Sequence, residues 1–411
     1  MSNNSGSHSL LYVTSLGIQM WDFFINGKET YTGLLPFFVP LQELLKRDDV
    51  KKIVFILFIN KKYRKYGITI PERHRNKIVV YPIYCDESFK SPSFTFIKCP
   101  WAVCFGFYLV KKYNIGRIIG HGTIGVIGGI IARIARIPFV SRLYGVAWTQ
   151  KDLDLSKVRF FLKHPTLFLS LKIKSEAIIA TNDDSLREQF FDKFGNKKNK
   201  FFLLFDGVDK DINLKVSDPG ISIPEPYFSY VSRYDRFKRL HLAIDAWRYL
   251  RNQLGDRTPY LVFVGPVSDK RYYDELLKKV EEDKLTDCVK FFDGMPHSKS
   301  MWILKNSIAT LILYEVALFS NVFIESMHLG VPVIASSVGS KSIEFLPEGT
   351  YFPTSSDPLD ISRMVLEVLN NDEKRNQVAS KARKFSEENI PSWDERLKLE
   401  LKLFIGDSND G

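Results

Sequence analysis

The chain has 411 residues, of which 45% are hydrophobic and 26% charged, so it is long enough for two folded domains and too apolar for a disordered protein. No apolar run approaches the ~20 residues that cross a bilayer, the N-terminus lacks the features of a signal peptide, and the four cysteines contain no Cys-x-x-Cys pair. These features predict a cytoplasmic protein without a transmembrane helix, a disulfide framework or a metal site.

The positive charge is concentrated in the first half of the chain. Residues 1–210 contain 32 Lys and Arg against 17 Asp and Glu, a net charge of +15, whereas the remainder carries −4. A basic first half favours contact with a polyanion or with an anionic membrane, and a solvated basic surface is the alternative. No RNA- or DNA-reading motif accompanies this charge, so nucleic-acid binding is not predicted.

Short apolar runs alternate with amphipathic stretches along nearly the whole chain. A first series predicts strands at Leu10–Thr14, Lys52–Phe58, Ile78–Tyr81, Arg117–Gly120, Phe139–Leu143, Ala177–Ala180 and Phe201–Phe205, with helices at Leu34–Leu45, Gly125–Arg136, Val158–Leu171 and Ser185–Phe194. A second series predicts strands at Phe228–Val231, Tyr260–Val264, Val289–Phe292, Ile308–Leu313 and Val331–Ala335, with helices at Leu240–Leu250, Tyr272–Glu282, Ser300–Lys305 and Val322–Leu329. This alternation is typical of parallel sheets with helices on both faces.

Between the two series, Asp206–Pro226 is dense in Asp, Gly, Ser and Pro and has no hydrophobic period, which predicts a linker. The expected fold is α/β, with two Rossmann-like doubly wound domains facing each other across a cleft. The predicted boundaries are 1–210, 211–390 and a C-terminal segment at 391–411. Ligands of such domains bind at the carboxyl ends of the strands.

In two segments, the residues that follow a predicted strand form a pattern that favours anion binding. In Tyr31–Leu35, Gly33 opens a helix and lets backbone amides approach a phosphate, although a plain turn is equally consistent. In Ser232–Leu240, Arg233 leaves a strand and Lys238 begins the next helix, so the two cations can converge on one pyrophosphate. An exposed basic loop is the alternative.

A third segment, Ser320–Ala335, reads as a loop, a helix that Gly330 ends, and a strand. Glu325 is expected in the first helical turn, where its carboxylate can accept hydroxyl hydrogen bonds, and a helix-capping glutamate is the alternative. The amides of Asn321 and Val322 are expected to cradle a phosphate.

Together these segments resemble the retaining glycosyltransferases of family 4, from about Leu10 to Phe404. The family's Gly-Arg-(x)4-Lys motif matches Ser232-Arg233 through Lys238 with its spacing kept, and its Asn-Gly-Val-Asp motif appears as Asp206-Gly207-Val208-Asp209. Its Glu-Ala-Met-Ala-x-Gly-x-Pro-Val motif matches Glu325–Val333, and Ser392-Trp393-Asp394-Glu395 is similar to the start of its last helix, which crosses back onto the first domain.

The resemblance implies the GT-B fold, an acceptor-side first domain, a nucleotide-sugar-binding second domain and no cofactor or metal. It implies transfer of a sugar from a nucleoside diphosphate donor to an acceptor hydroxyl with retention, in the synthesis of a surface polysaccharide or glycolipid. Arg233 and Lys238 would stabilise the leaving diphosphate, which Gly33 would also approach. Met295 would lie near the base, and Glu325 would bind the ribose. The sugar and β-phosphate would contact the loop residues Phe319, Ser320, Asn321 and Val322.

Two positions depart from the family. The first glutamate of its Glu-(x)7-Glu motif falls on Ala317, which leaves Glu315 as a candidate substitute. The family often has His where this chain has Tyr144, which can hydrogen-bond a sugar hydroxyl but cannot act as an acid or base at neutral pH. His121 is a further candidate to line the cleft, with a structural histidine as the alternative.

The acceptor, a saccharide or a lipid-linked saccharide, is expected on the basic first domain. The predicted helix Val158–Leu171 combines basic with aromatic and aliphatic residues, which favours peripheral contact with the inner face of an anionic membrane. A core helix with solvated lysines is the alternative. Two rival functions are also consistent with the sequence: a catalytically weakened donor-binding or scaffold subunit, motivated by Ala317 and Tyr144, and a nucleotide-sugar epimerase of the same architecture.

Overall fold

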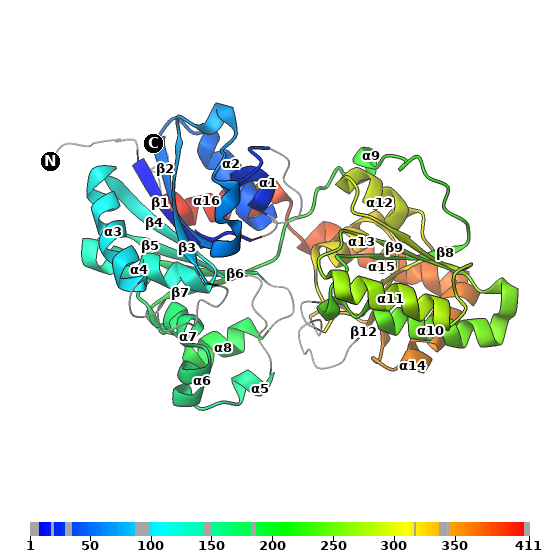
Figure 1. The fold of residues 1–411 in the computed structure, drawn as a ribbon. Helices are drawn as coiled ribbons and strands as arrows, with labels where there is room; N and C mark the ends of the chain where they lie inside the picture. The colour runs from blue at the N-terminus through cyan, green and yellow to red at the C-terminus, as the bar shows by residue number, and fades with distance from the viewer. Residues whose placement is uncertain are drawn as a thin grey trace. The chain divides into compact units, whose positions relative to one another are not determined.

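The computed structural model describes residues 8–17, 20–28, 35–86, 98–143, 150–181, 186–315, 318–336, 343 and 345–406. Among these residues the backbone forms two compact units. The first unit extends to Leu204 and also contains the last helix, and the second unit is Phe205–Trp393. Each unit has its own parallel sheet, coloured blue to green in the first and green to orange in the second (Figure 1).

The first sheet has seven parallel strands in the order β3-β2-β1-β4-β5-β6-β7. Its strands are β1 (His8–Ser15), β2 (Val50–Asn60), β3 (Ile78–Cys85), β4 (Ile115–His121), β5 (Phe139–Leu143), β6 (Ala177–Thr181) and β7 (Lys200–Leu204). Its helices are α1 (Trp21–Phe24), α2 (Leu35–Lys46), α3 (Cys99–Lys112), α4 (Val126–Ala135), α5 (Gln150–Leu153), α6 (Lys157–Lys163), α7 (Pro165–Lys172), α8 (Arg187–Phe194) and α16 (Trp393–Ile405).

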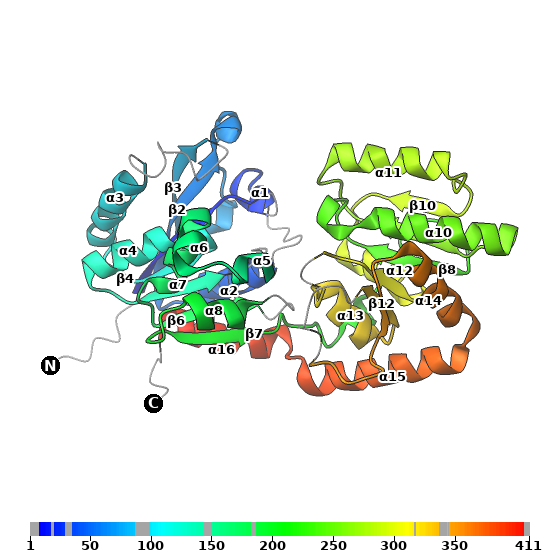
Figure 2. The same ribbon diagram turned by 90° about the horizontal axis from the view of Figure 1, so that it is seen from below.

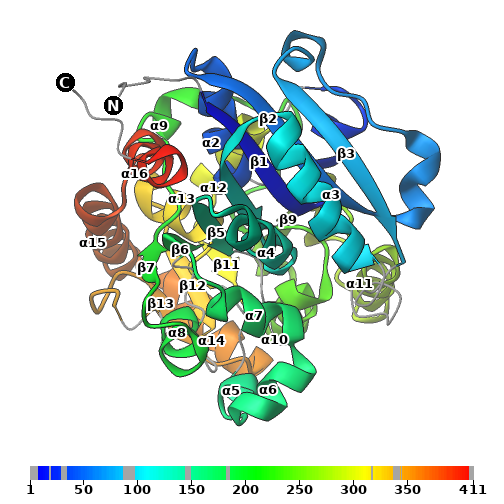
Figure 3. The same cartoon turned by 90° about the vertical axis from the view of Figure 1, so that its left-hand side faces the viewer.

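Both faces of this sheet are covered. Alternate residues of β2 enter different cores, as strand geometry requires: Phe55 and Leu57 pack with residues of α1, α2 and α16, whereas Val54 and Ile56 pack with residues of α3 and α4. Helices α5 to α8 gather beside β6 and β7 (Figures 2 and 3). The near-continuous apolar composition of the strands therefore reflects burial on two sides.

The second sheet has six parallel strands in the order β10-β9-β8-β11-β12-β13. They are β8 (Tyr227–Val231), β9 (Tyr260–Val264), β10 (Val289–Phe292), β11 (Thr310–Ile312), β12 (Val333–Ser336) and β13 (Phe352–Thr354). Its helices are α9 (Ile212–Lys215), α10 (Leu240–Leu254), α11 (Lys270–Glu282), α12 (His297–Lys305), α13 (Asn321–Leu329), α14 (Pro358–Asn370) and α15 (Asp372–Asn389), with α10 and α11 on one face of the sheet and α12 and α13 on the other (Figure 1). The prediction of two doubly wound parallel sheets is confirmed.

Two predicted segments differ in detail. The helix predicted at Val158–Leu171 is two helices, α6 and α7, because Pro165 excludes the helical conformation at the preceding His164, which has φ −134° and ψ 61°. The segment predicted as a linker, Asp206–Pro226, lies inside the second unit and contains α9.

A buried ion cluster fastens α16 to the first sheet. Glu400 is 1% exposed, and its Oε1 lies 2.8 Å from Nε of Arg142 on β5, while its Oε2 lies 2.8 Å from Nη1 of Arg396 one turn earlier. Arg142 also donates a hydrogen bond to the Thr181 hydroxyl on β6, at 3.0 Å. The last helix is therefore an integral part of the first unit.

Candidate functional site

The candidate site lies at the carboxyl ends of β8 and β11 in the second unit. These two strands are neighbours in the sheet although three crossovers separate them in sequence, so the chain leaves them toward opposite faces. This reversal of strand order is the point where open α/β sheets bind their ligands. The segment after β8 holds Arg233 and Lys238, and the segment after β11 leads into α13.

The structure brings Arg233 and Lys238 to the same neighbourhood. Arg233 follows β8, is partly exposed, and has its Nη2 3.2 Å from Oδ2 of Asp235. Lys238 is the last residue of a 3-10 turn at Arg236–Lys238, so the prediction that it begins the next helix is wrong, and α10 starts at Leu240. The Nζ of Lys238 lies 3.4 Å from the ring centroid of Tyr314, within cation–π distance.

Tyr314, which the sequence analysis missed, links these cations to α13. It follows β11 and is 2% exposed, and its hydroxyl donates to the carbonyl of Val231 at the end of β8, at 3.3 Å. Burial raises its pKa, while the adjacent Ser320 hydroxyl and the charge of Arg233 lower it. Three segments therefore meet at one ring. An aromatic residue directly after a predicted strand was the only signal in the sequence.

The predicted phosphate loop is the start of a helix. Ser320 is the N-cap of α13, and Asn321 and Val322 are its first two residues, so their amides have no acceptor within the helix and lie at the positive end of its dipole. Phe319 has a different place from the predicted one: its side chain is 2% exposed and packs against the rings of Phe205, Phe323 and Phe345. The site can therefore use the backbone of this loop but not the Phe319 ring.

Glu325 is held by a histidine that the sequence analysis did not select. Glu325 is the fifth residue of α13 and thus lies in its second turn, one turn later than predicted. Its Oε1 is 2.8 Å from Nε2 of His297, the first residue of α12. Its other oxygen makes no hydrogen bond to the residues that the structure describes, so it is available to a hydroxyl group.

The His297–Glu325 pair predicts a measurable pH dependence. The hydrogen bond to Glu325 raises the pKa of His297 above 6.5, against an opposing effect of desolvation. Because the folded-state pKa is the higher one, the stabilisation from the charged pair is fully present below pH 6.5 and is lost as the pH rises through the folded-state pKa. We expect NMR titration of His297 to give a pKa above 6.5 in the wild type and a lower value in Glu325→Gln. His241, whose pKa burial lowers, is the internal control, and an unchanged His297 pKa in the variant would contradict the contact.

The motif Asp206–Asp209 packs against the segment at Ser392 and Trp393. Val208 pairs with Ser392, and a Cβ on Gly207 would lie 2.7 Å from the backbone nitrogen of Trp393, so only glycine fits. Asp209 adds to the charge that raises the pKa of His297. The motif thus links the first residues of the second unit to its last residues.

The remaining predicted residues of the second unit lie in the loops that follow β10 and β11. Met295 lies in the loop between β10 and α12, two residues before His297, and is half-buried. Glu315, the candidate substitute for the missing glutamate, is about half exposed, and its Oε1 lies 3.9 Å from Nη2 of Arg239. Ala317 lies outside the described residues.

The predicted residues of the first unit are placed differently. His121 is 2% exposed and lies among the rings of Tyr12, Phe37 and Phe404, with a stacked contact to Tyr12 at 5.1 Å. Burial, with a smaller effect of Arg142, holds its pKa well below 6.5, so it is a neutral core residue and does not line a cleft. Gly33 and Tyr144 lie outside the described residues.

The described residues contain neither a metal-binding group of side chains nor a membrane-spanning helix. No group of three or more His, Cys, Asp or Glu side chains in this part of the chain is arranged to hold a metal ion. None of the helices given above has the length and apolar composition that crossing a bilayer requires.

Comparisons with known proteins agree with the fold. A model of the family "Glycosyl transferases group 1" matches residues 212–385. The alpha-1,3/1,6-mannosyltransferase ALG2 of Mus musculus is 28% identical over 143 residues, which make up 33% of this chain and 34% of the mannosyltransferase. The chain thus aligns with about a third of the length of that relative. A glycosyltransferase of Methanocaldococcus jannaschii is 22% identical over 311 residues, covering 72% of this chain and 80% of the relative.

Among solved structures, HepE of Anabaena, determined in complex with UDP, matches with a TM-score of 0.67 at 17% identity over 96% of this chain and 99% of HepE. At that identity the match shows a shared fold. The family match spans both groups of site residues in the second unit: Arg233, Lys238 and Tyr314, and the pair His297 and Glu325. Residues 212–385 are thus similar to the group 1 glycosyltransferases, and the two Rossmann-like sheets have the GT-B fold.

Proposed function

We propose that the protein is a retaining glycosyltransferase that moves a sugar from a nucleoside diphosphate donor to an acceptor hydroxyl. The observation that carries the proposal is the convergence of Arg233, Lys238 and the start of α13 on Tyr314. Two cations and a helix N-terminus at one strand edge form an environment for a diphosphate.

These groups would act on the leaving group. As the bond between the anomeric carbon and the β-phosphate oxygen breaks, negative charge accumulates on the phosphate, where Arg233, Lys238 and the amides of Asn321 and Val322 stabilise it. The acceptor oxygen bonds to the anomeric carbon on the same face, and its proton passes to the departing phosphate. Since the two side chains supply the positive charge, we expect turnover to continue in EDTA.

Glu325 would position the donor. Its carboxylate is fixed through one oxygen by His297, at 2.8 Å, and the other oxygen can accept a ribose hydroxyl. Met295, in the loop before His297, would contact the base. HepE was solved with UDP and ALG2 is a mannosyltransferase, so uridine nucleotides and mannose belong among the donors tested.

We propose that the acceptor is a lipid-linked saccharide and that α6 contacts the inner face of an anionic membrane. Val158 and Leu162 on α6 are 68% and 73% exposed, and Phe161 is 39% exposed, beside exposed Lys157 and Arg159. Exposed apolar side chains flanked by cations suit an anionic interface. A role in the synthesis of a cell-surface polysaccharide or glycolipid follows from such an acceptor.

The direct test is turnover. The full chain is incubated with UDP- and GDP-linked sugars, mannose included, and with lipid-linked and free saccharide acceptors, and the released diphosphate and the product are measured. We expect a product whose anomeric configuration equals that of the donor. Donor binding without turnover under every condition would support the scaffold alternative, and a product of inverted configuration would overturn the retaining mechanism.

A further inference from the structure

The first unit contains a large basic pocket at the edge of its sheet opposite to the one where ligands bind in such folds. The pocket has a volume of about 1300 Å³. It is lined at the amino-terminal ends of four adjacent strands, by Arg117 near the start of β4, Phe139 at the start of β5, Ala177 at the start of β6 and Lys200 at the start of β7. Because the carboxyl ends of these strands lie at the other edge, the pocket is distinct from a donor or acceptor site at that edge.

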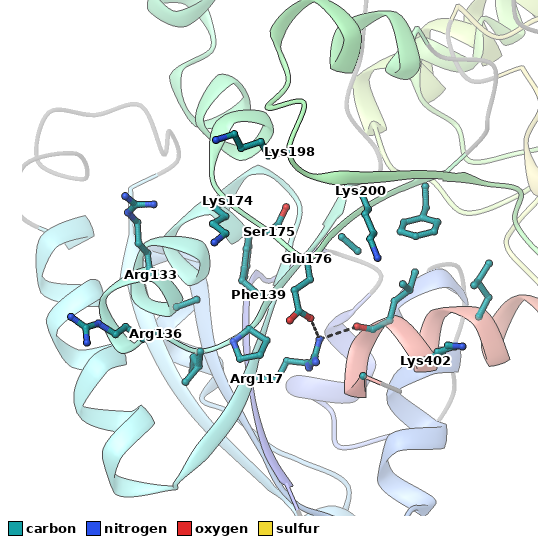
Figure 4. A pocket seen from close by; sticks show the side chains of 18 residues that line it. Arg117, Arg133, Arg136, Phe139, Lys174, Ser175, Glu176, Lys198, Lys200 and Lys402 are labelled. Atoms are coloured by element: carbon teal, nitrogen blue, oxygen red, sulfur yellow. Dashed lines mark hydrogen bonds and ion pairs between the residues drawn. The ribbon is translucent and has the colours of Figure 1, made fainter. Parts of the chain in front are cut away.

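Positive charge dominates the lining. Seven basic side chains line the pocket, and Figure 4 shows those of Arg133, Arg136, Lys174, Lys198, Lys200 and Lys402 around it. The one carboxylate in the lining, Glu176, is paired with Arg117. Five of the cations, Arg133, Arg136, Lys174, Lys198 and Lys200, have no carboxylate within 4.0 Å in the described part of the chain. Like charges gathered in one concavity repel each other unless an anion binds there.

Helix electrostatics explain only part of this cluster. Arg133 and Arg136 lie at the carboxyl end of α4, where cations offset the helix dipole. Lys174 also lies just beyond the carboxyl end of α7, whereas Lys198 precedes β7 and Lys200 begins it. Helix dipoles therefore do not explain why Lys198 and Lys200 line the pocket.

A buried side chain, that of Asn199, holds the two backbone segments that carry these lysines. Asn199 is 6% exposed, and its side chain accepts a hydrogen bond from the amide of Ser175 at 3.0 Å and donates one to the carbonyl of Ile173 at 2.7 Å. It thereby ties the segment before β6 to the segment before β7. The Ser175 hydroxyl in the same wall is buried and has no hydrogen-bond partner among the described residues, a cost that a phosphate oxygen would remove.

We propose that this pocket is a second anion-binding site and that its ligand carries two or more phosphate groups. Arg133 and Arg136 bind the ligand from α4, and Lys174, Lys198 and Lys200 bind it from the strand starts. Such phosphates come from a free oligophosphate or from the headgroups of anionic lipids, and the two sources are separable by experiment. The site is independent of the donor site in the second unit.

The test uses a charge-removing pair of substitutions that preserves the fold. Arg136 has φ 58°, a left-handed conformation that favours glycine, so Arg136→Gly is expected to leave thermal stability equal or higher. It is combined with Lys198→Gln, an exposed residue. The matched control is Lys51→Gln with Arg75→Gln, which removes one lysine and one arginine from exposed positions of the same unit outside the pocket.

Binding of inorganic tripolyphosphate is measured by calorimetry, and binding of phosphatidylglycerol vesicles by sedimentation, with the full chain in both cases. Each cation removed should weaken binding about tenfold, so the pocket pair should lower the affinity about 100-fold and the control pair by much less. Lys238→Ala should retain this binding, which separates it from the donor site. An effect on tripolyphosphate identifies a free phosphate ligand, and an effect on vesicles alone identifies lipid headgroups. Equal losses in both pairs, or no binding of either probe, would overturn the proposal.

Discussion

Replacing Lys238 with alanine is expected to lower kcat/KM for donor turnover by about 100- to 1000-fold, the range for removal of one group that stabilises developing negative charge. The Nζ of Lys238 lies over the Tyr314 ring at 3.4 Å, beside the segment that carries Arg233. The loss should appear mainly in kcat, because charge on the phosphate grows in the transition state. Lys238→Met removes the charge but keeps the apolar stem, and should give a similar loss.

Arg236→Ala is the matched control for this experiment. Arg236 belongs to the same 3-10 turn, but its guanidinium pairs with Glu275 and lies over Tyr272, away from Tyr314. Both variants remove one cation from the same short segment, so a general electrostatic effect would reduce activity in both. If Arg236→Ala is as impaired as Lys238→Ala, or if Lys238→Ala retains full activity, the proposed position of the leaving group is wrong.

Removing the Glu400 carboxylate is expected to have the largest effect on stability. In Glu400→Ala, Arg142 and Arg396 lose the carboxylate of Glu400 while they stay in the core, at 0% and 3% exposure. Breaking a buried pair in this way costs about 3–5 kcal/mol. Urea unfolding should show the loss, and hydrogen exchange should show that protection falls in β5 and α16 first, because the cluster joins these two elements.

The control for this variant is Glu388→Ala on α15. Glu388 is exposed and lies 4.0 Å from Lys384 one turn away, a pair worth about 0.3–0.5 kcal/mol. Since both substitutions replace a helical glutamate by alanine, helix propensity affects them similarly. A loss in Glu400→Ala no larger than that of Glu388→Ala would show that the buried cluster does not hold α16.

The order of elements could be read from the sequence because burial of a strand or of one helix face leaves a local period. The apolar runs at Lys52–Phe58 and Phe228–Val231 predicted β2 and β8 within two residues of their observed bounds. Gly330 was correctly predicted to end α13, since it has φ 72°, which favours glycine. A helix end that depends on a single side chain is harder to predict. One helix was expected at Val158–Leu171, and Pro165 divides it into α6 and α7.

The α/β class, the two sheets and the segments that carry Arg233, Lys238 and Glu325 could be predicted from the sequence, because strand period and short motifs are local properties. Which side chains meet follows from the tertiary fold. Tyr314 joins two strands that are neighbours in the sheet and distant in the chain, and His297 reaches Glu325 across 28 residues. The basic pocket likewise gathers cations from Arg117 to Lys402, which no local pattern relates. Such meetings depend on strand order and helix packing, which are set by burial over the whole unit.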